Sequence, residues 1–321
     1  MKVHIWGASG YAAAEAIRLI ATHPALELGV LESRSHAGSS VAQHFPDLRT
    51  LPYRFSEAGS VLGALRDGEF VIAAGGHGEA IARVPEFLKK GARVVDLSAD
   101  FRFDDNAVYG LTEWNRAPIA DAALVANPGC YPTASLLALL PLLHLKRARQ
   151  LVVDAKSGIT GAGRNPSLGA LYAEVARDIR PYGLDQHRHQ PEIERVLAAN
   201  DTLAPLVFTP HVVPLSRGML ADAYAMYDTA PDEGAVQAAF ARAYAGSPFV
   251  RVLEEGMTPS VAAVVGTNDA EIRVDVLGNT VRVLCAIDNL GKGAAGQAIQ
   301  NLNVMLGIPE ETGFGTRAIL A

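Results

Sequence analysis

Residues 2–13 have the sequence KVHIWGASGYAA, and they indicate the fold more clearly than any other segment of the chain. Lys2–Trp6 is short, apolar and β-prone, and the glycine turn Gly7-Ala8-Ser9-Gly10 follows it directly. Tyr11–His23 has the apolar spacing of a helix, and Leu26–Leu31 is a second candidate strand. A strand, a glycine turn, a helix and another strand form the opening of a dinucleotide-binding βαβ unit.

The same alternation continues to Ala126 and predicts an α/β Rossmann domain. We expect further strands at Phe70–Ala74, Ala92–Leu97 and Leu124–Ala126, and a helix at Gly78–Lys90. Parallel strands that are joined by helices form a sheet with helices on both faces.

The pattern then changes and predicts an α+β substrate or catalytic domain with a mainly antiparallel sheet. Strand-like segments follow at short intervals, and Leu277-Gly278-Asn279 is typical of a hairpin turn. The expected strands are Leu151–Ala155, Leu206–Pro214, Met219–Asp228, Val250–Leu253, Val261–Val265, Glu271–Val276 and Thr280–Ile287, and the expected helices are Pro191–Ala199 and Glu233–Ala245. A last helix, about Ala294–Leu306, is expected to pack on the first domain. The predicted domains are therefore residues 1–129, joined by a C-terminal helix within about 290–321, and residues 130–289.

The composition limits the classes of protein that this chain can represent. A length of 321 residues favours two domains, and 49% hydrophobic with 19% charged residues excludes a disordered chain. The net charge of −6 and the lack of basic runs argue against nucleic acid or an anionic membrane as partner. The N-terminal apolar segment is too short for a signal peptide, and Ala134–Leu145 is too short to span a bilayer. We therefore expect a cytoplasmic protein.

The first glycine turn has the pattern GxxGxxA, with Ala13 at the position that packs the helix on the strand. Glycines let such a turn close tightly and let the backbone approach a pyrophosphate, which the first amides of the helix then bind. The alternative is an ordinary tight turn. The predicted cofactor ligands from this turn are Gly7, Ser9, Gly10, Tyr11 and Ala12.

The end of the second strand carries signals for both nicotinamide cofactors. Glu32 is typical of NAD binding, whereas Arg34, between Ser33 and Ser35, is suited to the 2′-phosphate of NADP. We favour NADP(H), with Ser33 and Arg34 as ligands, and interpret Glu32 as a solvated strand end.

The two cysteines have different surroundings. Cys285 lies in the apolar run Val283–Ile287, which is typical of a buried core thiol. Cys130 instead follows a turn, Asn127-Pro128-Gly129, and begins a helix, where the helix end favours the thiolate. A thiolate near a nicotinamide indicates attack on an acyl carbon, formation of a thioester, and hydride transfer that releases an aldehyde.

Residues 127–134, NPGCYPTA, resemble the active-site signature of the N-acetyl-gamma-glutamyl-phosphate reductase (N-acetyl-glutamate semialdehyde dehydrogenase) family. Other segments agree in family order over nearly the whole chain, among them residues 96–102, 156–158, 161–164, 187–193, 214–218 and 288–293. The resemblance implies reduction of N-acetyl-L-glutamyl 5-phosphate by NADPH to N-acetyl-L-glutamate 5-semialdehyde and phosphate, in arginine biosynthesis. It also implies a semialdehyde dehydrogenase-like fold in a homodimer or homotetramer. Three places depart from the family pattern, namely Glu32, Ala13 and the run Gly75-Gly76-His77-Gly78.

The resemblance and the position of two histidines before a helix predict the catalytic set. A histidine near a helix N-terminus tends to stay neutral, as a general base requires. We expect His189 to exchange protons with Cys130 and the reacting oxygen, and His187 to be a substrate ligand or an orienting residue. The alternative is a pair of surface histidines at a helix cap. Glu192 either interacts with the helix dipole or orients a histidine. No further ligand accompanies the two histidines in sequence, so we expect no metal site.

Arginines and a glycine-rich loop are candidates for binding the acyl phosphate. Arg217 offers a planar fork for a carboxylate or phosphate, and residues 157–164 offer amides. The alternative is a set of solvated arginines in glycine-rich turns. The predicted substrate ligands are Arg217, Ser157, Gly158, Arg164 and Arg102, and the resemblance adds Ser98 and Asn289 to the cofactor ligands. Lys292 either lies near the nicotinamide or is an ordinary surface charge.

Two other functions stay open. A carrier-protein-linked aminoadipyl- or glutamyl-phosphate reductase of lysine or arginine biosynthesis shares the architecture but lacks the Tyr131-Pro132 found here. A non-catalytic NADP-binding protein would have an unreactive Cys130. Rapid, selective alkylation of Cys130 would distinguish the last possibility from an enzyme.

Overall fold

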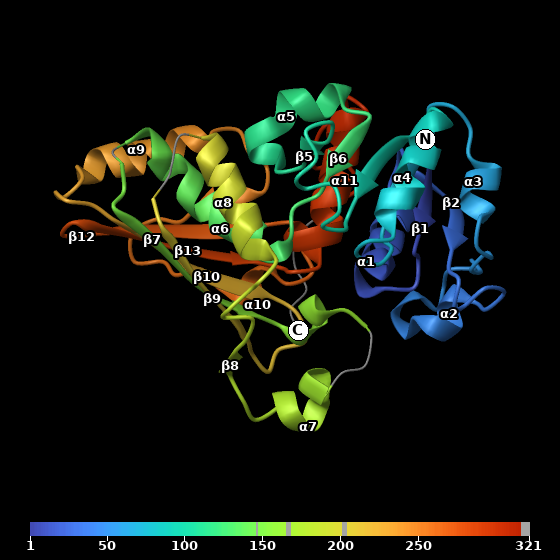
Figure 1. The fold of residues 1–321 in the computed structure, drawn as a ribbon, viewed down its shortest axis with the longest axis horizontal. Coiled ribbons are helices and arrows are strands. Elements are labelled where there is room, and N and C mark those ends of the chain that lie inside the picture. The colour runs from blue at the N-terminus through green and yellow to red at the C-terminus, as the bar shows by residue number, and fades with distance from the viewer. Residues whose placement is uncertain (146, 165–167, 201–203, 316–321) are drawn as a thin grey trace. The chain divides into compact units, whose positions relative to one another are not determined.

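A computed structural model describes residues 1–145, 147–164, 168–200 and 204–315 (Figure 1). The chain forms two compact units. The first unit contains Met1–Pro128 and the chain from Ala294 onward, and the second contains Gly129–Gly293.

The first unit is built on a parallel sheet with the strand order β2-β1-β3-β4-β6-β5. The predicted Rossmann pattern is confirmed, because every neighbouring pair in this sheet is parallel. The strands are β1 (Lys2–Trp6), β2 (Glu27–Glu32), β3 (Phe70–Ala73), β4 (Arg93–Asp96), β5 (Val108–Tyr109) and β6 (Leu124–Ala126). The helices are α1 (Tyr11–Ala21), α2 (Val41–His44), α3 (Ser60–Ala64), α4 (Ala80–Lys89), α5 (Thr112–Asp121) and α11 (Gly296–Met305).

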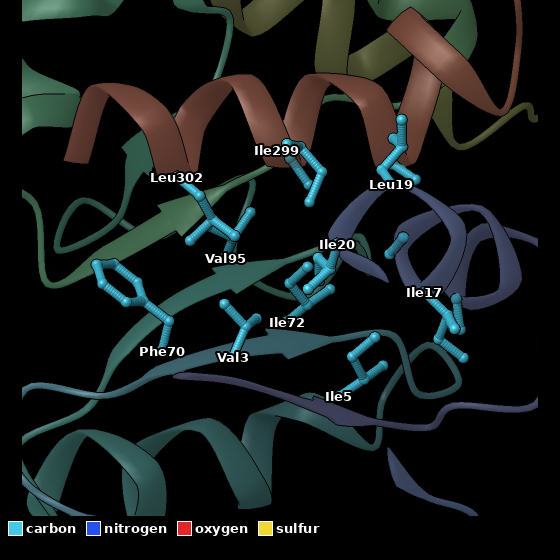
Figure 2. Packing of buried hydrophobic residues seen from close by; sticks show 14 of the residues in the cluster. Val3, Ile5, Ile17, Leu19, Ile20, Phe70, Ile72, Val95, Ile299 and Leu302 are labelled. Carbon is cyan, nitrogen blue, oxygen red and sulfur yellow. The ribbon is translucent and has the colours of Figure 1, made fainter. Parts of the chain in front are cut away.

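The core of the first unit joins the two ends of the sequence (Figure 2). Ile17 and Ile20 on α1 pack with Val3 of β1, and Ile299 and Leu302 of α11 belong to the same buried cluster. The apolar face of α1 recurs every three to four residues, which is why this segment forms a helix against the sheet. Burial of these side chains holds the turn between β1 and α1 in place.

The second unit is a seven-stranded sheet with the order β11-β12-β13-β10-β7-β9-β8. Helices α6, α8 and α9 lie on one face of it (Figure 1). The strands are β7 (Gln150–Ser157), β8 (Arg180–Pro181), β9 (Leu206–Val212), β10 (Met219–Met226), β11 (Val250–Val252), β12 (Ala270–Leu277) and β13 (Thr280–Ile287). The helices are α6 (Cys130–Leu139), α7 (Tyr172–Val175), α8 (His189–Ala199), α9 (Glu233–Ala243) and α10 (Val261–Val264). Short helical turns lie at η3 (Ile159–Ala162) and η4 (Leu168–Ala170), and η5 (Gly291–Ala295) crosses from the second unit into the first.

The prediction of a mainly antiparallel sheet is confirmed for the second unit. β10 pairs antiparallel with β13 and β7, and β12 pairs antiparallel with β13, while β7–β9 and β11–β12 are parallel. The predicted strand at Val261–Val265 is wrong, because Val261–Val264 forms the short helix α10. A short apolar run has no periodicity that separates a strand from a buried helical turn.

None of the helices among the described residues is long and apolar enough to cross a membrane.

Candidate active site

Cys130 is the first residue of α6, directly after the extended cap residue Gly129. Every residue of α6 after Cys130 is buried, so the helix is held firmly in the second unit. The Thr133 hydroxyl donates to the Gly129 carbonyl at 2.9 Å and fixes this first turn. The positive end of the helix favours an anion at the Cys130 side chain. Cys285 is fully buried on β13, as predicted.

Glu192 holds the backbone immediately before the cysteine. Its Oε1 accepts the Gly129 amide at 3.0 Å, and its side chain is buried in the first turn of α8. The first turns of α6 and α8 are therefore joined. The sequence suggested a dipole interaction or a histidine contact for Glu192, and this bond to Gly129 was missed because the two residues are 63 positions apart.

The two predicted histidines lie together at the start of α8. The ring centroids of His187 and His189 are 5.0 Å apart, and they lie 5.6 and 5.7 Å from the ring of Tyr131, the residue after Cys130. Nδ1 of His187 accepts the His189 amide at 3.2 Å, so the neutral ring carries its proton on Nε2. Burial, together with the charge of Arg188, lowers the pKa of His187 to about 4. His187 is thus neutral at neutral pH.

Two tyrosines extend this aromatic cluster. The Tyr131 hydroxyl donates to the His211 carbonyl at 2.9 Å, and the Tyr182 hydroxyl donates to the Tyr131 hydroxyl at 3.2 Å. Burial raises the pKa of both phenols, that of Tyr182 to about 12, so both stay protonated. Sequence reasoning missed Tyr182, although it lies just before the histidine segment.

The glycine-rich loop after β7 is locked to a second loop by Asn289. Oδ1 of Asn289 accepts the Gly218 amide at 2.7 Å, and Nδ2 donates to the Thr160 hydroxyl at 3.0 Å. A Cβ on Gly158 would lie 3.0 Å from the backbone of Arg217, so a side chain there would force that backbone to shift by a few tenths of an ångström. The predicted cofactor ligand Asn289 therefore joins two loops of the second unit. Ser157 is buried in this region, and Arg164 is exposed.

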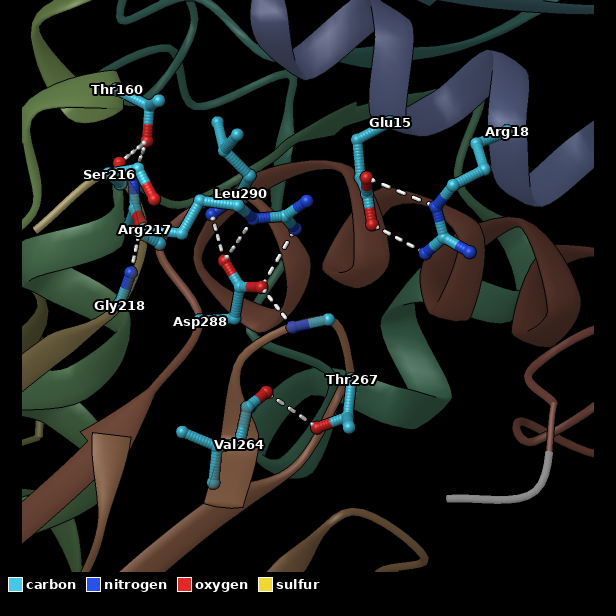
Figure 3. Close-up of polar contacts among 12 residues, drawn as sticks. Glu15, Arg18, Thr160, Ser216, Arg217, Gly218, Val264, Thr267, Asp288 and Leu290 are labelled. Atoms are coloured by element: carbon cyan, nitrogen blue, oxygen red, sulfur yellow. Dashed lines mark hydrogen bonds and ion pairs between the residues drawn. The ribbon is translucent and has the colours of Figure 1, made fainter. Parts of the chain in front are cut away.

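Arg217 is fixed by a buried carboxylate (Figure 3). Its Nη2 and Nε lie 2.7 and 3.3 Å from the two oxygens of Asp288, which is fully buried. Asp288 also accepts the amides of Gly266 at 2.6 Å and Leu290 at 2.9 Å. The sequence alone indicated no role for Asp288, because its partner Arg217 lies 71 residues away. The fork of Arg217 is thus held in one orientation.

The segment after Asp288 reaches Cys130. The Gly293 amide donates to the Asp288 carbonyl at 2.9 Å, and a Cβ on Gly293 would lie 2.7 Å from Cβ of Cys130. Any larger residue at 293 would displace the cysteine. Lys292 between them is fully buried, with Nζ 5.9 Å from the Phe249 ring centroid, so the surface-charge interpretation is wrong.

The dinucleotide turn of the first unit fits a pyrophosphate. Gly7 has φ of +79°, and a Cβ there would lie 2.5 Å from the Gly75 nitrogen. Outside residues 9–11, no described atom lies within 4 Å of the Cβ position of Gly10, which directly precedes α1. Ala13 is buried, as expected of a packing position. A tight turn with open space at the start of an eleven-residue helix is the geometry that binds phosphate.

The end of β2 differs from expectation at Glu32. Glu32 is only 4% exposed and accepts the amides of Gly59 at 3.0 Å and Val61 at 2.9 Å, at the start of α3. The solvated-end interpretation is wrong, because this carboxylate caps a helix. The Arg34 side chain is 80% exposed, and its Nη2 donates to Oε1 of Glu79 at 3.1 Å. Ser33 is buried, and its hydroxyl has no hydrogen-bond partner among the described residues. This arrangement suits a 2′-phosphate at Arg34.

Two further predicted ligands lie in the backbone framework of the first unit. Arg102 is buried and donates to the carbonyls of Asn127 at 3.0 Å and Leu97 at 3.2 Å. The Ser98 hydroxyl donates to Asp96 at 2.7 Å, and burial raises the pKa of Asp96 to about 6. Ligand roles for Arg102 and Ser98 stay predictions.

Comparisons with known proteins agree with this geometry. Residues 2–122 match the family described as semialdehyde dehydrogenase, NAD binding domain, and residues 130–289 match semialdehyde dehydrogenase, dimerisation domain. The chain is 40% identical to an N-acetyl-gamma-glutamyl-phosphate reductase of Pelotomaculum thermopropionicum, over 98% of this chain and 97% of that protein. It is 43% identical to the protein of that name from Citrifermentans bemidjiense, over 98% of each chain.

Solved structures show the same fold at low sequence identity. Aspartate semialdehyde dehydrogenase II from Vibrio cholerae, complexed with ASA, superposes with a TM-score of 0.75 at 17% identity, over 95% of this chain and 98% of that one. Aspartate semialdehyde dehydrogenase with NADP from Candida albicans gives a TM-score of 0.73 at 16% identity, over the same shares. The predicted semialdehyde dehydrogenase-like fold is confirmed.

Proposed function

Because the chain belongs to the N-acetyl-gamma-glutamyl-phosphate reductase family, we propose that it reduces N-acetyl-L-glutamyl 5-phosphate with NADPH in arginine biosynthesis. The products are N-acetyl-L-glutamate 5-semialdehyde and phosphate. The observation that carries the proposal is Cys130 at the start of α6, with His187 and His189 packed on the adjacent Tyr131. A half-buried cysteine at a helix end, followed by a tyrosine on which the neutral ring of His187 packs, has the surroundings of a nucleophile.

The reaction needs two steps at Cys130. Sγ attacks the acyl carbon, the bond from that carbon to the phosphate oxygen breaks, and phosphate leaves a thioester on Cys130. NADPH, when bound, supplies the hydride that the thioester carbon receives. His189 takes the thiol proton at the start and protonates the carbonyl oxygen as charge develops there. The carbon–sulfur bond then breaks, the proton returns to His189, and the semialdehyde leaves.

The surrounding residues orient this chemistry. Glu192 fixes the Gly129 amide and hence the start of α6, and His187 holds the backbone of His189. Arg217, Arg164, Arg102, Ser157 and Gly158 are the proposed ligands of the acyl phosphate. Such positioned donors stabilise charge that develops on the reacting oxygens.

The cofactor is proposed to bind the first unit. The turn from Gly7 to Ala12 would hold the pyrophosphate, and Arg34 the 2′-phosphate, with Ser33, Ser98 and Asn289 as further candidates. We propose a homodimer or homotetramer in the cytoplasm, since the second unit matches a dimerisation domain. Its other partners are the acyl phosphate and inorganic phosphate.

The test is phosphate-dependent reduction of NADP⁺ by the purified protein. N-acetyl-glutamate semialdehyde is compared with aspartate semialdehyde, and a strong preference for the acetylated substrate is expected. Activity with neither, despite NADP⁺ binding, would contradict the proposal and favour a carrier-linked substrate or a non-catalytic binder.

A further inference from the structure

We propose that a cavity beside the start of α6 binds the acyl chain of the substrate, with Arg180 as the ligand of a carboxylate on that chain. The cavity has a volume of about 200 Å³ and lies within the second unit. Its lining includes Tyr131, Tyr182, Ile159, Val212 and Arg180. The identity of the acyl chain rests on the proposed function.

The cavity lies close to the reactive thiol. Tyr131, which forms one wall, is the residue directly after Cys130. Tyr182 forms another, and besides burial the nearby charge of Cys130 raises the pKa of its hydroxyl. Ser157 and Gly158 at the end of β7, both predicted substrate ligands, also line it. An acyl group bound here has its chain in the cavity while its reacting carbon is near Cys130.

Most of the lining is apolar and fixed in place. The hydroxyls of Tyr131 and Tyr182 bond to the His211 carbonyl and to each other, so the two rings keep their orientation. Ile159, Ala162 and Val212 add aliphatic surface. Such a surface suits methylene groups and a small apolar substituent, because their burial removes apolar area from water. The volume is below the usual range of about 300–1,000 Å³ for ligand pockets, which favours a short chain.

Arg180 places a positively charged guanidinium in the lining of this mostly apolar cavity. The residue is half-buried in β8, and its Nη2 donates to the Gly169 carbonyl at 2.8 Å. Among the described residues that carbonyl is the only hydrogen-bond partner of the guanidinium, and no carboxylate pairs with it. A guanidinium beside apolar surface is stabilised by a carboxylate that accepts two parallel N–H bonds. An N-acetylglutamyl chain supplies one α-carboxylate and one apolar acetyl methyl.

The test compares two substrates and two protein variants in all four combinations, as in a double-mutant cycle. Wild type and Arg180→Gln are assayed with N-acetyl-glutamate semialdehyde and with its α-carboxamide, in phosphate-dependent NADP⁺ reduction. We expect kcat/KM of the wild type to fall about 10- to 100-fold when the carboxylate is removed, as for loss of a charged hydrogen bond. Arg180→Gln should lose as much with the carboxylate and discriminate less than about threefold between the two substrates, because the changes are coupled.

Matched controls separate charge from folding. Arg177→Gln makes the same charge change at an exposed position three residues away and should behave as wild type. Arg180→Lys should recover part of the discrimination, and NADP⁺ binding should be unchanged in every variant. The wild-type comparison of carboxylate with carboxamide holds even where a variant does not fold.

The outcomes distinguish this inference from the proposed function. A wild type that prefers the acetylated semialdehyde but treats carboxylate and carboxamide alike overturns the role of Arg180. Retained discrimination in folded Arg180→Gln does the same. A wild type with no semialdehyde activity overturns the proposed function, and the cavity is then tested by protection of Cys130 from iodoacetamide. N-acetyl-L-glutamate should protect better than its α-amide, and equal protection contradicts the inference.

Discussion

Two helices in this protein begin in the same local way, yet their ends are used differently. α1 follows Gly10 with φ, ψ of −85°, 170°, and α6 follows Gly129 with −70°, 160°. Glycine has no side chain with which to cap, so both helices rely on something else to satisfy their first amides. Each follows a parallel strand of the first sheet in the chain, β1 in one case and β6 in the other.

The difference lies in what surrounds the two ends. Outside residues 9–11, no described atom lies within 4 Å of the Cβ position of Gly10, so the N-terminal end of α1 has room for an anionic ligand. At α6 the Gly129 amide is bound by Glu192, and Gly293 packs against Cys130. The N-terminal end of α1 can therefore bind an anionic ligand, whereas that of α6 can stabilise an anionic side chain, the thiolate of Cys130. The local sequence determines where each helix begins, and residues far away in the sequence determine what surrounds that end.

Replacing the Cys130 thiol should give the largest difference between the two helix ends, because it affects catalysis at α6 and leaves cofactor binding at α1 unchanged. Cys130→Ser is expected to lower kcat at least about 1,000-fold, because the covalent step loses its nucleophile. NADP⁺ affinity, measured by calorimetry, should stay within about twofold of wild type, since the first unit is untouched. Near-normal turnover of this variant in the phosphate-dependent assay would falsify the thioester mechanism.

Loosening the α6 end should have the next largest effect. Glu192→Ala removes the partner of the Gly129 amide, and we expect kcat to fall about 100-fold, as a misplacement of about 1 Å can do. Alkylation of Cys130 by iodoacetamide should slow as well. Glu192→Gln keeps an oxygen that can accept the amide and should recover part of both rates. An equal loss of kcat and of alkylation rate in the two variants would mean that the negative charge of Glu192 matters, and not its hydrogen bond to the Gly129 amide.

Sequence reasoning worked where one short segment carries the whole signal. In the first unit β3 is a continuous apolar run and β1 is apolar apart from Lys2 and His4, and the turns at Gly7 and Cys130 contain the residues that their backbones require. It failed where a short run lacks a period, as at Val261–Val264, which forms a helix. The fold was therefore predictable from local pattern, and the role of Cys130 as nucleophile stays a prediction.

The contacts that position the site were not predictable, because their partners are far apart in sequence. Glu32 binds Val61, 29 residues away, and Arg217 pairs with Asp288, 71 residues away. The same distance hides the burial of Lys292, which is charged in sequence and enclosed in structure. A single sequence shows which residues are charged but not which ones meet.

The preference for NADPH over NADH tests the proposed cofactor site of the first unit, which includes the open N-terminal end of α1. Arg34→Ala should raise KM for NADPH about 10-fold and change KM for NADH less than about twofold, since only NADPH carries the 2′-phosphate that the guanidinium can bind. The matched change at the strand end is Glu32→Gln. Because Glu32 caps α3, that variant should lose about 1 kcal/mol of unfolding free energy while keeping the NADPH preference. A marked rise of KM for NADH in Glu32→Gln would show instead that the carboxylate faces the ribose, because a carboxylate there would bind the 2′-hydroxyl.

The smallest expected effect concerns His187, whose ring packs on Tyr131 in the first turn of α6. Its pKa is about 4 in the folded chain, against an ordinary value of 6.5, because burial disfavours the charged ring. As pH falls through 6.5 the unfolded chain takes up a proton that the folded chain does not, so stability decreases between about pH 6.5 and 4. The ring is partly exposed, so we expect only about 1 kcal/mol between pH 7 and 5. Urea unfolding should show this extra loss in wild type and not in His187→Gln, and identical pH slopes would mean that His187 titrates as it does in the unfolded chain.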